Sequence, residues 1–470
     1  MRKILNNGII AGIFTAIVFA GTSCSKQNSW THFRGPDGNM ALESASLPEK
    51  WSTDTNVVWT AEFEGNGFSS PVVWGNRIII TAAVPVRVNP APERPPMPAP
   101  QPQQGDPGRQ GGQQASQGQR PQQTPQPQLP EVRDTTFMNE IYRLELKCFD
   151  SKTGELLWSK VPFNGTPRYG KHQNGSYANE TPVTDGQRIY ASFGMHGIYC
   201  YDMEGNLLWN KDFGTYYTQR GWGTGSSPVL LNNLLYFQFD NEETSFLIAL
   251  DASTGNEEWK VMRDEKTTYS TPYIWKNLIR TELVTCGKKA RSYDPETGKL
   301  LWELEVGGEQ VIPSPVGNEE LLFIGNAGGR DIKARLFAIM AGAEGEVEKS
   351  EIAWMSEESG LGNPSPLLYR DRLYVIGGRG EIAVLDPLNG TLKYQKRING
   401  IGAVWASPWA NNNLIYFLDE RGVTRSFKAG DSFELVNENK LEGERFWSSI
   451  ALAGNSYIFK SAGKMYCVRR

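Results

Sequence analysis

Apolar and polar residues alternate along most of this 470-residue chain, in short runs separated by turns rich in Gly, Asn and Asp. A typical run is "GFSSPVVWGNRIIIT" (67–81), in which a small residue and a proline precede an alternating apolar stretch. Proline is tolerated at the start of a strand because its missing N–H breaks no ladder hydrogen bond there. No long segment has a convincing helical period, so the pattern predicts an all-β protein.

The strand-starting phrase returns at a nearly fixed spacing. From Pro182 onward the successive positions lie 46, 44, 43, 51, 42 and 42 residues apart, and the last has Ile450 in place of proline. A period of about 40 to 45 residues is typical of one four-stranded propeller blade. The sequence therefore predicts an eight-bladed β-propeller of four-stranded antiparallel blades, whose first strands begin in the segments 67–81, 177–193, 223–239, 268–284, 311–325, 362–377, 404–419 and 446–460.

The ring is expected to close through an N-terminal strand. The eighth unit supplies three strands before Arg470, and the segment "NVVWTAEF" (56–63) supplies one strand before the first unit. We predict that this N-terminal strand is the fourth strand of the last blade. The propeller then spans residues 56–470.

A second phrase recurs near the end of several units. It reads "LKCFDSKTGELLW" at 146–158 and returns in related form at 198–209, 248–259 and 291–302. Its aspartate can accept backbone N–H groups in the turn, and its glycine suits a residue with positive φ. Its tryptophan falls on the outermost strand, where a large ring can dock one blade on the next. The predicted docking residues are Trp59, Trp158, Trp209, Trp259, Trp302 and Trp354.

The N-terminus has the layout of a secretory signal, because two basic residues precede an apolar stretch at 9–20 and small residues lead to Cys24. This resembles a bacterial lipoprotein signal, so residues 1–23 are predicted to be removed and Cys24 to carry the lipid. The alternative is an ordinary cleaved signal followed by a chance cysteine. Residues 24–55 would form the anchor and lead-in segment of an exported, lipid-anchored protein. No acidic run follows Cys24, which favours the outer membrane, facing the periplasm.

The other cysteines are predicted to be buried thiols. Cys148 and Cys200 each stand two residues before the aspartate of the second phrase, where another unit has Ala249. They therefore occupy one repeated small-residue position, and equivalent positions in neighbouring blades are too far apart for a disulfide. Cys286 and Cys467 complete the set, for which two disulfides are the alternative in an exported protein.

A biased segment interrupts the first unit. Residues 89–130 hold 12 Pro, 12 Gln and 5 Gly in 42 positions and no aromatic residue. Such a composition cannot bury enough apolar surface to fold, so a disordered insertion is predicted at about 87–137. The alternative is a proline-rich ligand for the groove of a partner.

These features together resemble the PQQ-binding-like (quinoprotein-type) β-propeller repeat family. The similarity rests on the repeated "D-x-x-T-G-x-x-x-W" and "S-P-V" phrases, and on "WTHFRGPDGN" (30–39) and "LPEKW" (47–51). One branch of the family contains quinone-dependent dehydrogenases. The resemblance implies for them a PQQ cofactor stacked on a tryptophan, a calcium ion held by carboxylate and amide oxygens, and a catalytic aspartate. The other branch contains lipoproteins similar to BamB, which support outer-membrane protein assembly without catalysis.

The sequence favours the non-catalytic branch. It lacks the adjacent cysteine pair common in the dehydrogenases, an acidic cluster with calcium-loop spacing, and the motifs H-E-x-x-H, C-x-x-C and G-x-S-x-G. No catalytic residue, cofactor or metal site is therefore predicted, although PQQ with calcium stays open. The net charge of -4 gives no sign of a nucleic-acid partner.

Two long connections are the candidate binding region. The segments 162–180 and 213–225 follow the fourth strands of the first two blades and should share one face with the insertion. Aromatic side chains beside basic ones on loops suit recognition of a partner, and the alternative is that these rings plug the propeller mouth. The candidate residues are Tyr169, His172, Tyr177, Glu180, Tyr216, Arg220 and Trp222.

The leading hypothesis is a monomeric, non-catalytic scaffold that binds a protein or peptide partner in the cell envelope. A PQQ-dependent oxidoreductase similar to alcohol or sugar dehydrogenases is the first alternative. A carbohydrate-binding propeller is the second.

Overall fold

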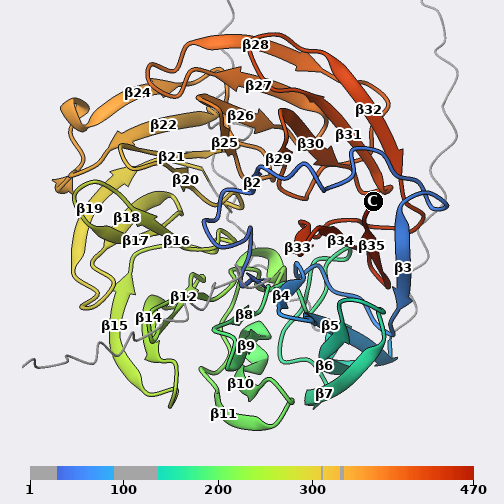
Figure 1. The fold of residues 1–470 in the computed structure, drawn as a ribbon. Helices are drawn as coiled ribbons and strands as arrows, with labels where there is room; N and C mark the ends of the chain where they lie inside the picture. The colour runs from blue at the N-terminus through green and yellow to red at the C-terminus, as the bar shows by residue number, and fades with distance from the viewer. Residues whose placement is uncertain (1–28, 89–135, 309–310, 329–332) are drawn as a thin grey trace, which may run out of the picture.

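The eight-bladed propeller predicted from the repeats is confirmed. The computed structural model describes residues 29–88, 136–308, 311–328 and 333–470. They form eight sheets arranged around a central axis (Figure 1). Each sheet is a blade of four antiparallel strands, and three of the sheets also hold a short fifth strand. The described residues contain no α-helix, and their only helical turns are the short 3-10 helices η1 (Thr136–Asn139), η2 (Gly194–His196), η3 (Gln219–Gly221) and η4 (Lys349–Glu351).

The strands of each blade follow one another from the axis outward. In blades one to four they are β4 (Val72–Trp74), β5 (Arg77–Arg87), β6 (Ile141–Asp150) and β7 (Leu156–Gly165); β8 (Val183–Thr184), β9 (Arg188–Ser192), β10 (Ile198–Asp202) and β11 (Leu207–Lys211); β12 (Val229–Leu231), β13 (Leu234–Phe239), β14 (Ser245–Asp251) and β15 (Glu257–Arg263); and β16 (Tyr273–Lys276), β17 (Thr281–Thr285), β18 (Lys289–Tyr293) and β19 (Leu300–Glu305).

Blades five to eight repeat this order. Their strands are β20 (Val316–Gly317), β21 (Leu321–Asn326), β22 (Arg335–Met340) and β24 (Ile352–Ser356); β25 (Leu367–Tyr369), β26 (Arg372–Ile376), β27 (Glu381–Leu385) and β28 (Leu392–Arg397); β29 (Trp409–Asn411), β30 (Leu414–Leu418), β31 (Val423–Lys428) and β32 (Leu435–Lys440); and β33 (Ala451–Ala453), β34 (Ser456–Lys460), β35 (Lys464–Val468) and β3 (Val57–Glu62).

The N-terminal strand closes the ring as predicted. Strand β3 pairs antiparallel with β35, with Thr60 opposite Tyr466. The last blade is thus built from both ends of the propeller. The predicted signal, Cys24 and almost all of the predicted insertion lie outside the described residues.

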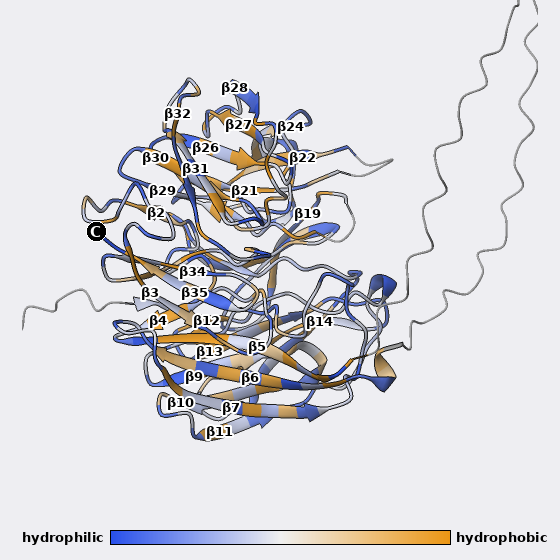
Figure 2. Ribbon diagram, turned by 90° about the vertical axis from the view of Figure 1, so that its right-hand side faces the viewer, coloured by the Kyte–Doolittle hydropathy of each residue, from blue (hydrophilic) through white to orange (hydrophobic). Residues whose placement is uncertain are grey.

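Burial changes from the axis to the rim of each blade. The middle strands pack against neighbouring blades on both faces, so β13 is almost entirely buried, whereas β28 is mostly exposed. Figure 2 shows the same change as hydrophobic colour on β13 and hydrophilic colour on β28. The period-two pattern is therefore clearest in the outer strands, and the inner strands are nearly continuous apolar runs.

A ring of hydroxyl groups joins the blades at the axis. The residue before each strand-starting proline is serine or threonine, and its backbone N–H donates to the hydroxyl oxygen of the equivalent residue in the next blade. Seven such bonds have lengths from 2.9 to 3.4 Å. We call this set the hydroxyl ring: Ser70, Thr181, Ser227, Thr271, Ser314, Ser365, Ser407 and Ser449.

The last and first blades are joined by additional contacts. Ser448 Oγ donates to Phe68 O at 3.3 Å. The Nζ of the buried Lys460 donates to the carbonyl oxygens of Gly67 and Ser69. Burial lowers the pKa of Lys460 to about 7, and no carboxylate of the described residues forms an ion pair with it.

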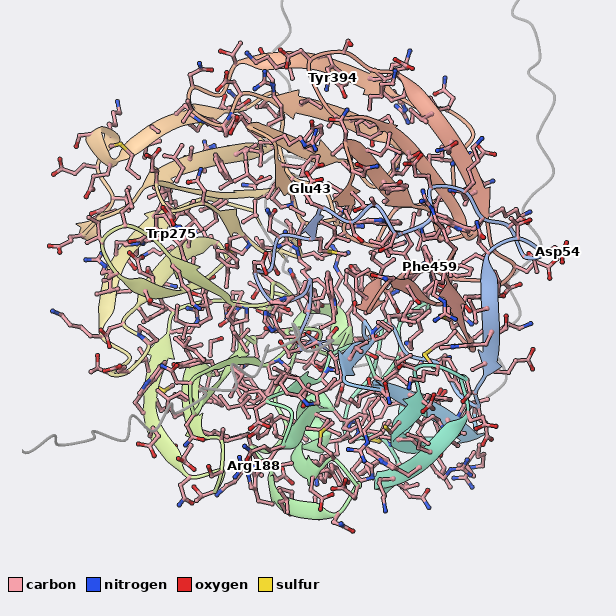
Figure 3. The ribbon with its side chains drawn as sticks, viewed as in Figure 1. Glu43, Asp54, Arg188, Trp275, Tyr394 and Phe459 are labelled. Atoms are coloured by element: carbon pink, nitrogen blue, oxygen red, sulfur yellow. The ribbon has the colours of Figure 1, made fainter. Side chains whose placement is uncertain are left out.

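Residues 29–51, called the strap, cross one face of the propeller. Strand β1 (Ser29–Trp30) pairs with β4 of blade one, and β2 (Ala41–Leu42) pairs with β29 of blade seven. Between them the buried Arg34 donates to two carbonyl oxygens, Pro315 O at 2.9 Å and Pro366 O at 2.7 Å. Figure 3 shows Glu43 near the centre of this face and Asp54 at its periphery, so the chain runs outward to β3.

The recurrent tryptophans contact the following blade. Trp209 Nε1 donates to Ala252 O at 3.1 Å, and its ring lies against Gly255. Gly255 has a φ of +71°, and a Cβ there would come within 2.7 Å of the indole. Both facts explain why glycine occupies this turn. The same hydrogen bond to the next blade is made by Trp59, Trp158, Trp259 and Trp354.

Trp302 is the exception among these tryptophans. Its Nε1 donates to Glu282 Oε2 of its own blade at 2.7 Å, although the ring still packs with residues of blade five. Blade five lacks the glycine turn that would receive the indole. In its place the connection from β22 to β24 contains β23 (Gly345–Glu346), which adds to the outer edge of blade four in parallel.

The four cysteines predicted to be buried are buried. Cys148, Cys200, Cys286 and Cys467 are free thiols inside the blades. Burial raises the pKa of Cys148 and Cys200 to about 12, as expected for inert thiols in an apolar setting. Both face the outermost strand opposite a docking tryptophan, Trp158 or Trp209.

The hydroxyl ring yields a stability prediction. Replacing Ser227 by alanine leaves the buried N–H of Thr181 without an acceptor, so the free energy of unfolding should fall by about 1–3 kcal/mol. Ser227→Thr keeps the hydroxyl, since threonine already occupies this ring position in blades two and four. It should change the free energy of unfolding by less than about 0.5 kcal/mol. Urea unfolding of both variants measures the difference. Equal stability of the two variants would show that the ring bond contributes nothing.

Candidate functional site

A pocket opens on the axis, on the face opposite the strap. Its volume is about 490 Å³. All eight members of the hydroxyl ring line it. Phe33 of the strap closes the end that faces the strap, because this residue borders both the pocket and the cavity under the strap. We call this cavity the axial pocket. The face of the propeller on which it opens is called the mouth face.

The hydroxyl ring forms the floor of the axial pocket, and the wall comes from the same strand-starting phrase of the sequence. In every blade the residue two positions before the ring hydroxyl also lines the pocket. In extended chain, side chains two residues apart point the same way, so one phrase supplies floor and wall together. The eight wall residues are Phe68, Asn179, Gly225, Tyr269, Ile312, Asn363, Trp405 and Trp447.

Three of these side chains form a continuous aromatic row. The rings of Trp405 and Trp447 are stacked, with centroids 4.6 Å apart and planes at 28°. Phe68 continues the row at 4.5 Å from Trp447. Blades seven, eight and one therefore present an apolar side to the pocket.

Polar groups stand elsewhere on the wall. Asn179 donates its Nδ2 to Thr224 O at 3.2 Å, but its buried Oδ1 has no hydrogen-bond partner among the described residues. The buried hydroxyl of Tyr269 and the indole N–H of Trp405 likewise have none within that part of the chain. A pocket with one aromatic side and several convergent polar groups is typical of a binding site.

Charged side chains are absent from this wall. Among the described residues that line the pocket, none is Asp, Glu, Lys or Arg. Burial and the nearby Lys171 lower the pKa of His172, which is therefore neutral at pH 7. Two carboxylates lie one layer behind: Glu180 accepts from Thr224, and Glu420 accepts from Trp447 Nε1 at 3.4 Å.

The seven sequence-predicted site residues separate into two groups of three and the single carboxylate Glu180. Tyr169 and Tyr177 are buried and pack on each other and on His196, with Tyr177 Oη donating to Tyr169 O at 3.0 Å. Tyr216 packs against Phe239 between blades two and three. These three rings fill the space between loops, as the plug interpretation describes.

Three other predicted residues lie at the rim of the mouth. The rings of His172 and Trp222 meet edge to face at 4.9 Å, and both line the axial pocket. The exposed Arg220 guanidinium lies over the Trp222 ring, 5.0 Å from its centroid. Phe137, at the end of the predicted insertion, lies near Gly170 of the first long connection.

Glu180 is buried beside the pocket. The Thr224 hydroxyl donates to Glu180 Oε1 at 2.5 Å and also lies 3.3 Å from Tyr169 Oη. Burial raises the pKa of Glu180 to about 7, against the opposing effect of the Thr224 hydrogen bond. The titratable groups nearest to it, Tyr169 and Tyr216, have raised pKa values for the same reason.

Sequence reasoning missed most of the pocket. It singled out neither the hydroxyl ring nor Phe33, Tyr269, Trp405 and Trp447. The signal was present: serine or threonine precedes all seven strand-starting prolines as well as Ile450. Comparison of the repeats two positions earlier would have identified the wall.

A model of one protein family matches most of this chain. Its description is "Outer membrane protein assembly factor BamB", and it matches residues 142–274 and 280–470. The chain belongs to this family. Membership in the BamB family confirms the resemblance to PQQ-like repeat propellers that the sequence indicated. No curated protein matches the chain.

Solved structures similar to this BamB-family propeller include two dehydrogenases. Quinohemoprotein alcohol dehydrogenase from Comamonas testosteroni is 10% identical, with a TM-score of 0.59 over 94% of this chain and 80% of that one. Quinohemoprotein alcohol dehydrogenase ADHIIG from Pseudomonas putida HK5 is 9% identical, with a TM-score of 0.53 and the same coverage. BamB from Moraxella catarrhalis is 12% identical, with a TM-score of 0.36 over 62% of this chain and 96% of that one. The two dehydrogenases show a shared fold alone.

The axial pocket does not fit the cofactor set of the dehydrogenase branch. That set needs carboxylate ligands for calcium and a catalytic aspartate, and the pocket wall carries no carboxylate. Within the described ranges no cluster of three or more His, Cys, Asp or Glu could hold a metal ion. The described residues also contain no helix that is long and apolar enough to cross a membrane.

The buried carboxyl of Glu180 predicts a pH effect on stability. Its pKa is about 7 in the folded protein and near 4.5 unfolded, so between these values only the folded state keeps the proton. The free energy of unfolding should therefore fall as the pH rises from 4.5 to 7, by up to about 1.4 kcal/mol per pH unit from this group. Glu180→Gln should remove this part of the slope, as urea unfolding at several pH values would show. An unchanged slope in the variant would contradict the assignment.

Proposed function

We propose that this protein is a non-catalytic scaffold of the cell envelope that binds a protein or peptide partner on its mouth face. The observation that carries the proposal is the rim contact of exposed Arg220 over half-buried Trp222, beside a pocket whose wall bears no charged side chain. Arginine and tryptophan are the residues most often responsible for affinity at protein interfaces. Family membership supports the same role, since the family is described as an outer membrane protein assembly factor.

The absence of an acid–base pair on the pocket wall also supports a binding role. General acid–base catalysis needs a titratable group within hydrogen-bond reach of the reacting atoms. The titratable side chains among the described residues that line the pocket are His172 and Tyr269; burial raises the pKa of Tyr269, and the carboxyl of Glu180 lies behind Thr224. We therefore include in the proposal that no cofactor or metal is required.

Anchoring completes the proposal. Cys24 is the proposed lipid attachment site and lies five residues before Ser29, where the described chain begins. Strand β1 pairs Ser29 with Trp74, at the far end of β4 from the hydroxyl ring. A lipid at Cys24 would hold the strap face toward the periplasmic surface of the outer membrane and leave the mouth face open to a partner.

A charge reversal at the rim tests the partner site. Lipidated protein carrying Arg220→Glu should capture at least about tenfold less of its envelope partner from solubilised membranes, because the cation is lost without disturbing the core. Quantitative mass spectrometry of the captured proteins measures the change.

The matched control is Arg397→Glu, which reverses an exposed arginine on the outer strand of blade six. It should capture the same partners as the unaltered protein. If Arg220→Glu also captures them equally, the mouth rim is not the partner site.

A further inference from the structure

We propose that the axial pocket binds an uncharged saccharide ring, such as a neutral hexose or N-acetylhexosamine unit of a glycan. The inference concerns the interior of the pocket and goes beyond the protein partner proposed for its rim. It follows from the hydrogen-bonding state of the floor, the aromatic row on the wall and the charge of the whole lining.

The floor presents hydroxyl protons that still need acceptors. The members of the hydroxyl ring from Thr181 to Ser449 each accept the backbone N–H of the preceding blade. None of the eight hydroxyls donates a hydrogen bond to another described residue, and all eight border the pocket. A purely apolar ligand would shield these groups from water without replacing the lost hydrogen bonds, which is unfavourable. The occupant should therefore carry several oxygen acceptors.

The wall adds a requirement for apolar surface. Trp405, Trp447 and Phe68 line three consecutive blades with ring contacts of 4.5–4.6 Å. Rings of this kind contribute most when they pack against C–H groups of a ligand. An ion or a small polar solute would leave this side of the pocket unused.

Amide and phenol groups complete the wall on the other blades. The amide of Asn363 lines the pocket and forms no hydrogen bond with another described residue. Asn179 Oδ1 and Tyr269 Oη also lack partners within the described part of the chain. Small side-chain rotations would give a ligand hydroxyl both donors and acceptors at separate points around the axis.

The lining of the pocket also disfavours a charged ligand. A buried charged ligand needs a countercharge, and the wall offers no Asp, Glu, Lys or Arg among its described residues. The pocket volume of about 490 Å³ lies in the usual range for small-ligand sites. A sugar ring combines apolar faces, many hydroxyl oxygens and no charge, and so meets all three conditions.

Saturation-transfer NMR on the detergent-solubilised full chain tests the proposal. The neutral probes are methyl glucoside, N-acetylglucosamine, cellobiose and diacetylchitobiose, and the charged probes are glucuronic acid and glucosamine. At least one neutral probe should receive saturation on its ring protons, and the charged ones should receive none. Trp447→Ala and Asn363→Ala should each weaken binding about tenfold, as expected for loss of one good contact.

Two control variants show whether sugar binding depends on the pocket interior. Trp209→Phe alters a docking tryptophan outside the pocket and should leave sugar binding unchanged, and so should Arg397→Glu, which changes an exposed residue on the outer strand of blade six. Asn363→Ala preserves the aromatic row, so it remains informative if Trp447→Ala does not fold.

The proposal is overturned if no neutral sugar receives saturation, or if binding is the same in both pocket variants as in the unaltered protein. It is also overturned if a proline-rich peptide, which offers carbonyl acceptors and apolar rings, binds in the pocket while every sugar fails.

Discussion

The hydrogen bond from one ring residue to the hydroxyl of the next is the interaction on which the architecture depends. Each strand that starts at a proline lacks an N–H at that position, and the residue before it would otherwise bury an unsatisfied donor at the axis. A serine or threonine in the next blade accepts that donor, so each blade is fixed at its inner end by its neighbour. Where blade eight meets blade one, Ser448 and Lys460 add contacts to the segment around Phe68.

The same ring places the candidate site. Because side chains alternate along an extended strand, fixing the hydroxyls at the floor places the residues two positions earlier on the wall. Blades seven, eight and one supply aromatic rings there, and blades two and six supply amides. The strap then closes the other end of the channel with Phe33. A structural repeat thus produces a pocket whose character is set by variation at one position per blade.

The sequence predicts the fold well and the site poorly. The spacing of the prolines predicts eight blades, and the isolated strand at 56–63 predicts the closure, because both rest on local patterns that recur. The long connections lie on the face where the axial pocket opens, and His172, Arg220 and Trp222 lie at its mouth. Tyr169 and Tyr177 lie beneath it, because whether a loop aromatic points inward depends on packing against His196, 19 residues further along the chain from Tyr177. Trp405 and Trp447 stand 42 residues apart in consecutive units, and they meet only because the fold places corresponding positions of neighbouring blades side by side at the axis.

We propose that the axial pocket binds uncharged ligands and that the protein needs no quinone cofactor. The most direct test of this proposal is an absorbance titration of the purified full chain with PQQ in the presence of calcium, followed by dye reduction with alcohols and sugars. An apo quinoprotein alcohol dehydrogenase serves as the positive control. We expect no stoichiometric complex and no dye reduction above the rate of free PQQ. A one-to-one complex that reduces the dye with an alcohol or a sugar would contradict the account.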